Sequence, residues 1–440
     1  MSRPPTGGRG DGNLAGHGNR ASSTVRAFTD GAAVRKVVRE LENELGEDKQ
    51  FSDIIDGRGH QYVDLVLEGG GVLGIALVGY LYALERVGIR FLQIGGTSAG
   101  SIVALLLAAL GTPAEAKSRE IIRHLATVDL FSFIDGDDDA RDFVDAVIEG
   151  SGRYTTLWKA GQVRDNLIRD LGLAAGEAFS QWLRATLAEA GIESTRELEQ
   201  RLRTLPDSLG VRGGDRMTVE EASPRLAVIA ADVTTQTKVQ FPEMADLYWA
   251  EPEAVHPAEY VRASMSVPFL FQPMRIERVP RGPRAWDRWL EVGYDEDIPE
   301  SCTLVDGGTM SNFPINLFHG TGVPTAPTFG AKLTSAGRRQ EVNDPQSLLK
   351  GIFNAARNTL DYDFVLRNPD YTRLVTRIDT SGHDWLDFRM GAEAKQELFL
   401  RGVEAAGEFL FKFDWAAYKK LRAQTAAAGG AAGGGGPSPA

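Results

Sequence analysis

The sequence predicts an α/β fold in which a mainly parallel central sheet lies between two layers of helices. The prediction rests on one pattern that occurs twice in succession, a short apolar strand, a glycine loop and a helix. The first copy is a strand at 62–67, the loop GGGVLG at 69–74 and a helix at 74–87. The second is a strand at 90–94, the turn GGTSAG at 95–100 and an apolar helix at 99–110. Because such sheets place ligands at the carboxyl ends of their strands, both glycine loops are expected there.

Later segments complete the predicted sheet. We expect strands at 225–231, 303–305, 328–333 and 371–378, and a closing amphipathic helix at 391–413. Composition divides the chain as follows: a flexible N-terminal tail and helical extension at 1–50, with the tail covering about the first thirty residues; a catalytic domain at 62–335 with a charged helical insertion or cap at 112–215; a completing helical and strand segment at 336–423; and a disordered Ala/Gly-rich tail at 424–440.

The totals of the chain exclude some classes of function. Its 440 residues carry a net charge of −12, so there is no basic excess for a nucleic-acid partner. The single cysteine, Cys302, cannot form an internal disulfide, and its strand-like context indicates a buried apolar residue rather than a reactive thiol. We see neither a signal peptide nor a transmembrane segment, and expect a cytoplasmic or peripheral membrane protein of unknown oligomeric state.

The turn GGTSAG fits the G-x-S-x-G nucleophile elbow through Gly96, Ser98 and Gly100. In that motif the serine sits on a tight turn between strand and helix, so its hydroxyl projects above the sheet edge. An ordinary turn or N-cap serine is the alternative. The strand before the turn and the helix after it favour a nucleophilic Ser98.

The loop GGGVLG also satisfies the G-x-G-x-x-G pattern of dinucleotide-binding folds. That function needs an acidic residue at the end of the second strand, but this strand runs instead into the serine elbow. A glycine run beside a nucleophile suits an oxyanion hole, in which backbone N–H groups bind the developing negative charge. The candidate donors are the backbone N–H groups of Gly69, Gly70, Gly71, Val72 and Gly74.

A serine needs a base, and two candidates are open. Asp306 ends the strand at 303–305 and precedes Gly307 and Gly308, which places it at the catalytic edge of the predicted parallel sheet. It can accept the serine proton directly or merely cap a turn. A Ser-Asp-His triad with His319 or His383 is also arithmetically possible, although neither histidine lies in a recognisable motif.

Together the three loops resemble those of the patatin-like phospholipases, lipid acyl hydrolases with a Ser-Asp dyad on an α/β/α sheet. The glycine motif matches 69–74, the elbow 96–100 and the Asp-Gly-Gly motif 306–308; RASMSVPFLFQP at 262–273 and NFPINLF from 312 are also similar to family segments. The similarity covers about 62–333. The chain departs from the pattern at Leu73, where many members carry Arg or Lys, and this puts recognition of a charged head group or membrane partner in doubt.

The resemblance implies a serine acyl hydrolase that cleaves phospholipid or acylglycerol esters through an acyl-enzyme, without metal or other cofactor. Ser98 would be the nucleophile and Asp306 the base. The expected partners are a lipid or fatty-acyl ester and a membrane surface contacted peripherally. The alternatives are a catalytically silent lipid-binding scaffold on the same fold and a Ser-Asp-His esterase.

Overall fold

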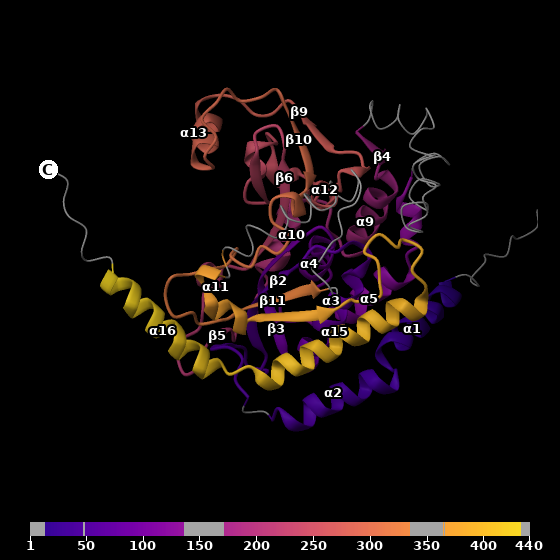
Figure 1. The fold of residues 1–440 in the computed structure, drawn as a ribbon, viewed down its shortest axis with the longest axis vertical. Coiled ribbons are helices and arrows are strands. Elements are labelled where there is room, and N and C mark those ends of the chain that lie inside the picture. Colours follow the sequence, from indigo (N-terminus) through magenta and orange to yellow (C-terminus); the bar gives the residue numbers. More distant parts are fainter. Residues whose placement is uncertain (1–13, 47–48, 136–170, 335–363, 365, 433–440) are drawn as a thin grey trace, which may run out of the picture.

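A computed structural model describes residues 14–46, 49–135, 171–334, 364 and 366–432 (Figure 1). Its centre is a ten-stranded sheet whose main strand order is β12-β11-β2-β3-β6-β10-β9. Five of these strands are parallel neighbours: β12 (Val375–Asp379), β11 (Thr328–Thr334), β2 (Gln61–Leu67), β3 (Ile89–Thr97) and β6 (Arg225–Asp232). The predicted mainly parallel sheet is therefore confirmed.

The remaining strands run antiparallel to their neighbours. β10 (Ser301–Asp306) lies between β6 and β9 (Met274–Glu277), and β7 (Thr237–Phe241) pairs with β6. At the margin, β1 (Ile54–Ile55) joins β2 to β5 (Gly210–Val211). The first three residues of the strand expected at 371–378 belong instead to a 3-10 helix, η6 (Pro369–Arg373), and β12 starts only after it.

The sheet carries helices on both faces (Figure 1). α3 (Gly74–Arg86) and α15 (Ala392–Lys412) form the most extensive helix pair, and α4 (Ala99–Ala109) packs on β3 and β6. The small residues of α3 explain its closest contact. A Cβ on Gly79 would lie 2.0 Å from the carbonyl oxygen of Phe399, and one on Gly402 would lie 2.0 Å from that of Ala76. These glycines thus allow the backbones of α3 and α15 to lie in direct contact.

Both ends of the chain contain more helix than composition predicts. α1 (Leu14–Thr29) occupies much of the predicted flexible tail, and the next helix is α2 (Ala32–Glu44). Val25 and Phe28 of α1 are buried, and the ring of Phe28 packs edge-on against Phe399 at 5.6 Å. α16 (Trp415–Ala432) likewise runs into the Ala/Gly-rich tail. The tail predictions are wrong for these two stretches. α1 docks through Val25 and Phe28, and α16 continues as a helix to Ala432 although its residues 423–427 are exposed.

The helical insertion predicted at 112–215 contributes α5 (Ser118–Thr127), α9 (Glu177–Glu189) and α10 (Thr195–Leu202). α9 packs on α12 (Ala258–Ser264), and β4 (Gly172–Ala174) pairs with β8 (Phe269–Phe271). Residues 136–170 of this insertion lie outside the described residues. The remaining short elements are α11 (Val219–Ala222), η1 (Gly71–Leu73), η2 (Leu130–Phe133), η3 (Ala245–Leu247), η4 (Pro252–Ala254) and η5 (Gly307–Thr309).

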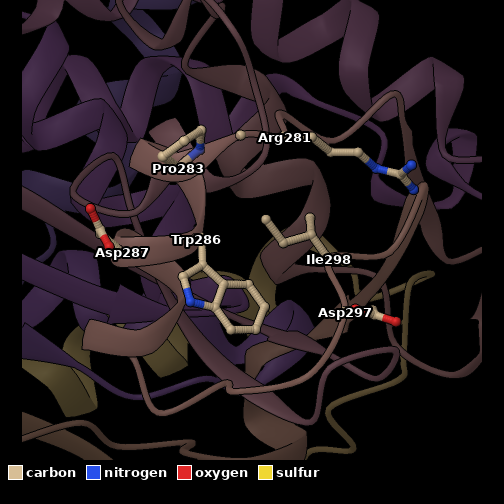
Figure 2. Close-up of a pocket in the computed structure, with 7 residues that line it drawn as sticks. Arg281, Pro283, Trp286, Asp287, Asp297 and Ile298 are labelled. Carbon is tan, nitrogen blue, oxygen red and sulfur yellow. The ribbon is translucent and has the colours of Figure 1, made fainter.

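The connection between β9 and β10 leaves the body of the molecule and carries α13 (Pro283–Glu291) (Figure 1). A surface pocket on this excursion is lined by Trp286, Pro283 and Ile298, among others, and Figure 2 shows their side chains around it. Within the described ranges, no helix is long and apolar enough to cross a membrane.

Candidate active site

Ser98 occupies a sharp turn between β3 and α4. Its backbone angles are φ 51° and ψ −124°, a conformation that is costly for a residue with a side chain and is typical of functional turns. The flanking glycines allow the turn to close. A Cβ on Gly96 would lie 2.5 Å from the carbonyl carbon of Gly100, and one on Gly100 would lie 2.3 Å from the carbonyl oxygen of Leu67. The strand-turn-helix context predicted for the elbow is present.

A second serine holds this turn in place. The Ser264 hydroxyl accepts a hydrogen bond from the Ser98 N–H at 2.9 Å and donates one to the Ile229 carbonyl at 2.6 Å. Ser264 is fully buried and ends α12, so the strained elbow is tied to the middle of β6. The sequence marked Ser264 only as part of a family-like segment and assigned it no role.

The strand registers place Asp306 beside the elbow. β7 occupies one edge of β6 from Val228 to Asp232, so β3 and β10 share the other edge. β3 ends there with Thr97 opposite Ile229, and β10 arrives from the opposite direction and ends with Asp306 opposite Ala230. The two strand ends therefore meet at adjacent positions, about 3.3 Å apart along β6.

This arrangement corrects one expectation. β10 runs antiparallel to β6, so Asp306 does not end a parallel strand of the sheet as the sequence suggested. It nevertheless comes to the serine, because its strand points toward the end of β3. The turn after it is tight: a Cβ on Gly307 would lie 2.1 Å from the Ile229 carbonyl oxygen.

Backbone groups fix the orientation of Asp306. Its N–H donates to the Ser266 carbonyl at 2.8 Å, and its carboxylate oxygen Oδ1 accepts from the Gly308 N–H at 2.6 Å. The side chain is buried, with 3% exposure, and Ser98 is similarly buried with 6%. Both members of the candidate dyad are thus preorganised and largely shielded from water.

The glycine loop lies directly against Ser98. A Cβ on Gly69 would be 3.0 Å from the Ser98 Cβ. Three of the five predicted donors already make hydrogen bonds within the protein: the N–H groups of Gly69, Val72 and Gly74 donate to the carbonyls of Asn312, Trp385 and Gly71, respectively. In the part of the chain that the structure describes, the N–H groups of Gly70 and Gly71 have no acceptor.

The family model for patatin-like phospholipases matches residues 65–319, which is more than half of the chain. The matched range includes the glycine loop at 69–74, Ser98 and Asp306. The chain belongs to the patatin-like phospholipase family. It is accordingly a lipid acyl hydrolase by family, and its substrate class is lipid.

Individual relatives that match most of the chain have low sequence identity to it. The chain is 27% identical over 303 residues to the uncharacterized protein YqhO of Bacillus subtilis, which covers 68% of this chain and 82% of YqhO. A 46-residue stretch is 56% identical to the lysophospholipase nte1 of Aspergillus niger, covering 10% of this chain and 3% of that protein. Among solved structures, VipD of Legionella pneumophila is similar with a TM-score of 0.40 and 16% identity, covering 82% of this chain and 70% of that one.

The glycine loop contacts a polar cluster formed by Glu68, Lys332 and Asn312, which the sequence did not indicate. Glu68 accepts from the Leu333 N–H at 2.6 Å and pairs with Lys332, whose Nζ lies 3.0 Å from Oε1. The Asn312 amide donates to the Gly69 carbonyl at 3.1 Å, so both backbone groups of Gly69 are held by Asn312. Leu73, which replaces the basic residue frequent at this position, is buried at 6% exposure.

Both candidate histidines have polar partners other than Ser98 and Asp306. Nδ1 of His319 lies 2.7 Å from the Tyr371 hydroxyl, and burial together with Arg422 lowers the pKa of His319. Nε2 of His383 lies 3.4 Å from a carboxylate oxygen of Glu397. Cys302 is fully buried, and burial raises the pKa of its thiol, in agreement with the structural role predicted for it. The described residues contain no cluster of three or more His, Cys, Asp or Glu side chains that could hold a metal ion.

Proposed function

We propose that the protein hydrolyses lipid esters by a Ser-Asp dyad, with Ser98 as nucleophile and Asp306 as general base. The observation that carries this proposal is the meeting of β3 and β10 on one edge of β6, which brings the two residues to adjacent positions. A carboxylate is a weak base in water, but Asp306 is buried and is already oriented by the Gly308 N–H.

In the first half of the reaction, the Ser98 Oγ attacks the ester carbonyl carbon while Asp306 takes the hydroxyl proton. The oxyanion is stabilised by the N–H groups of Gly70 and Gly71, and the N-terminus of α4 adds favourable electrostatic potential. Collapse of the tetrahedral intermediate breaks the ester C–O bond, and protonated Asp306 returns its proton to the leaving alcohol.

In the second half, water attacks the acyl-Ser98 carbonyl. Asp306, again ionised, accepts a proton from this water, and collapse of the second intermediate returns it to the Ser98 Oγ. The carboxylic acid leaves and the enzyme is restored. The chemistry of each step is supplied by side chains and backbone groups of this chain.

The proposal is tested by hydrolysis of phosphatidylcholine vesicles and of a soluble p-nitrophenyl ester by the wild type, Ser98→Ala and Asp306→Asn. Each variant should lose at least about 1,000-fold in kcat while keeping its thermal unfolding temperature. Asp246→Asn is the matched control, since Asp246 pairs with Arg288 on the surface and should be dispensable. A higher rate on vesicles than on dispersed ester would support peripheral membrane contact.

The outcomes separate the alternatives. A silent lipid-binding scaffold predicts no hydrolysis by the wild type at all. A Ser-Asp-His esterase predicts that His319→Ala or His383→Ala is as inactive as Asp306→Asn, whereas the dyad predicts near wild-type rates for both. Full activity in Asp306→Asn would refute the dyad.

A further inference from the structure

Arg262 begins the family-like segment at 262–273 and is a buried charge close to the candidate dyad. It lies in α12 and is only 8% exposed. α12 packs on β6 and β10 of the sheet and on α9 of the helical insertion (Figure 1). Burial lowers the pKa of Arg262, and within the described ranges its guanidinium forms no ion pair. Because burying a guanidinium costs free energy, its hydrogen bonds indicate what it holds in place.

One group of bonds leads to the candidate base. Nη1 of Arg262 donates to the Ser266 hydroxyl, which in turn donates to the Arg262 carbonyl at 2.8 Å. Ser266 has no solvent exposure, and its own carbonyl accepts the Asp306 N–H at 2.8 Å. Two residues earlier, the Ser264 hydroxyl accepts the Ser98 N–H. The end of α12 therefore contacts both members of the dyad, and Arg262 fixes the part that holds the base.

The other bonds lead to the helical insertion. Nη2 of Arg262 donates to the carbonyls of Ala175 and Gln272, which directly follow the paired strands β4 and β8. Gly176, the residue before α9, lies against the guanidinium. A Cβ on Gly176 would lie 2.6 Å from Nε of Arg262, and its φ of 75° also favours glycine. Arg262 thus joins the entry to α9 with the segment that holds Asp306.

The arrangement of acceptors suits an arginine. The Ser266 hydroxyl and the two carbonyls belong to three separate segments, and a planar guanidinium of fixed shape sets their relative positions. A lysine ammonium is a point charge on a flexible stem and cannot span them in the same way. A shift of Ser266 would move the backbone of Asp306 with it. Misplacement by about 1 Å can cost about 100-fold in rate.

We propose that Arg262 is a positioning residue of the hydrolysis, which acts on Asp306 through Ser266 and couples the helical insertion to the base. This inference rests on the proposed function, because it takes Asp306 as the base of Ser98. Among the described residues, Arg262 has no hydrogen bond to Ser98 or Asp306. Its loss should therefore disturb the orientation of the base and leave the reacting groups themselves present.

The test measures the second-order rate at which one fluorophosphonate modifies Ser98 in the full chain, followed by intact mass. Arg262→Met keeps an unbranched side chain but removes the donors, and should lower this rate about tenfold. In a protein that already carries Asp306→Asn, the same substitution should lower the rate less than about twofold, because no base is left to position. A general structural role would lower both rates by the same factor.

Two smaller changes follow the same path. Ser266→Ala keeps the carbonyl that holds Asp306 and removes only the hydroxyl that Arg262 binds. It should lower the rate about threefold, again only where Asp306 is present, and it is the reporter if Arg262→Met fails to fold. Gly176→Ala displaces the guanidinium and should lower the rate, with little further loss when it is combined with Arg262→Met.

Arg262→Lys and Arg201→Met serve as controls. Arg262→Lys keeps the charge without the planar group and should be nearly as slow as Arg262→Met. Arg201 lies on α10 and also donates to two backbone carbonyls, those of Ala109 at 2.8 Å and Ala190 at 2.9 Å. These bonds lead to the far end of α4 and to the end of α9, so Arg201→Met should modify Ser98 at the wild-type rate.

A wild-type rate in Arg262→Met, or equal losses with and without Asp306→Asn, would overturn the positioning role while leaving the dyad intact. Fully additive losses from Gly176→Ala and Arg262→Met would overturn the coupling to the insertion. Absence of labelling in the wild type, or equal rates in the wild type and Asp306→Asn, would instead refute the proposed function and the positioning role with it.

Discussion

Replacing Ser264 by alanine should weaken both the fold and catalysis, because this hydroxyl joins the elbow to β6. The substitution leaves the Ser98 N–H and the Ile229 carbonyl without their partner in a site with no solvent exposure. An unsatisfied buried group costs about 1–3 kcal/mol, so two groups together should lower the free energy of unfolding by about 2–6 kcal/mol. We expect kcat to fall about 10- to 100-fold with little change in KM, since the strained Ser98 loses its support.

The matched control is Ser101→Ala. Ser101 is equally buried, and its hydroxyl also bonds to the backbone of Ser98, at the carbonyl oxygen. That carbonyl still accepts the N–H groups of Ser101 and Ile102, so no group is left unsatisfied. Urea unfolding and steady-state ester hydrolysis should therefore separate the two variants. If Ser264→Ala and Ser101→Ala behave alike in both assays, the reasoning is refuted.

Three other perturbations have defined outcomes. Gly307→Ala places a Cβ 2.1 Å from a carbonyl oxygen of β6 and should abolish activity or folding, whereas Gly320→Ala meets open space and should be neutral in thermal unfolding. Asn312→Ala removes the side-chain bond to the Gly69 carbonyl and should lower kcat about tenfold; an unchanged kcat would exclude a positioning role. Burial raises the pKa of Asp64 to about 7, so the folded protein keeps a proton that the unfolded chain loses near pH 4. The free energy of unfolding should fall as pH rises from about 4 to 7, and Asp64→Asn should gain stability over the wild type at pH 8 but not at pH 4 in urea titrations.

Local patterns were sufficient to predict the elements around the elbow. The apolar runs that became β2, β3, β6 and β11 carry β-branched residues on largely buried strands, and the helices after the glycine loops are apolar almost all round. The direction of β10 could not be predicted, because pairing partners are chosen by contacts distant in sequence. The start of α1 was missed because the segment is short of apolar residues and docks through only a few of them.

The sequence singled out Ser98 and Asp306 as candidate reactive residues but did not indicate the residues that hold their loops in place. The spacing of glycines around Ser98 and after Asp306 is a local signal, since each turn requires residues without a Cβ. Ser264, Asn312 and Trp385 gave no such signal, because each acts through a bond to a loop more than 150 residues away in sequence. Among the described residues, the backbone carbonyls of Asn312 and Trp385 occupy the N–H groups of Gly69 and Val72, and a local bond to Gly71 occupies that of Gly74.

The most direct measurement of the central claim is the rate at which a fluorophosphonate modifies Ser98 in the wild type and in Asp306→Asn, with the modified peptide identified by mass spectrometry. Such a reaction reports activation of the hydroxyl without requiring the natural lipid. The dyad predicts modification of the Ser98 peptide alone and a rate at least about 100-fold lower in Asp306→Asn. Modification at another residue, or equal rates in the two proteins, would contradict it.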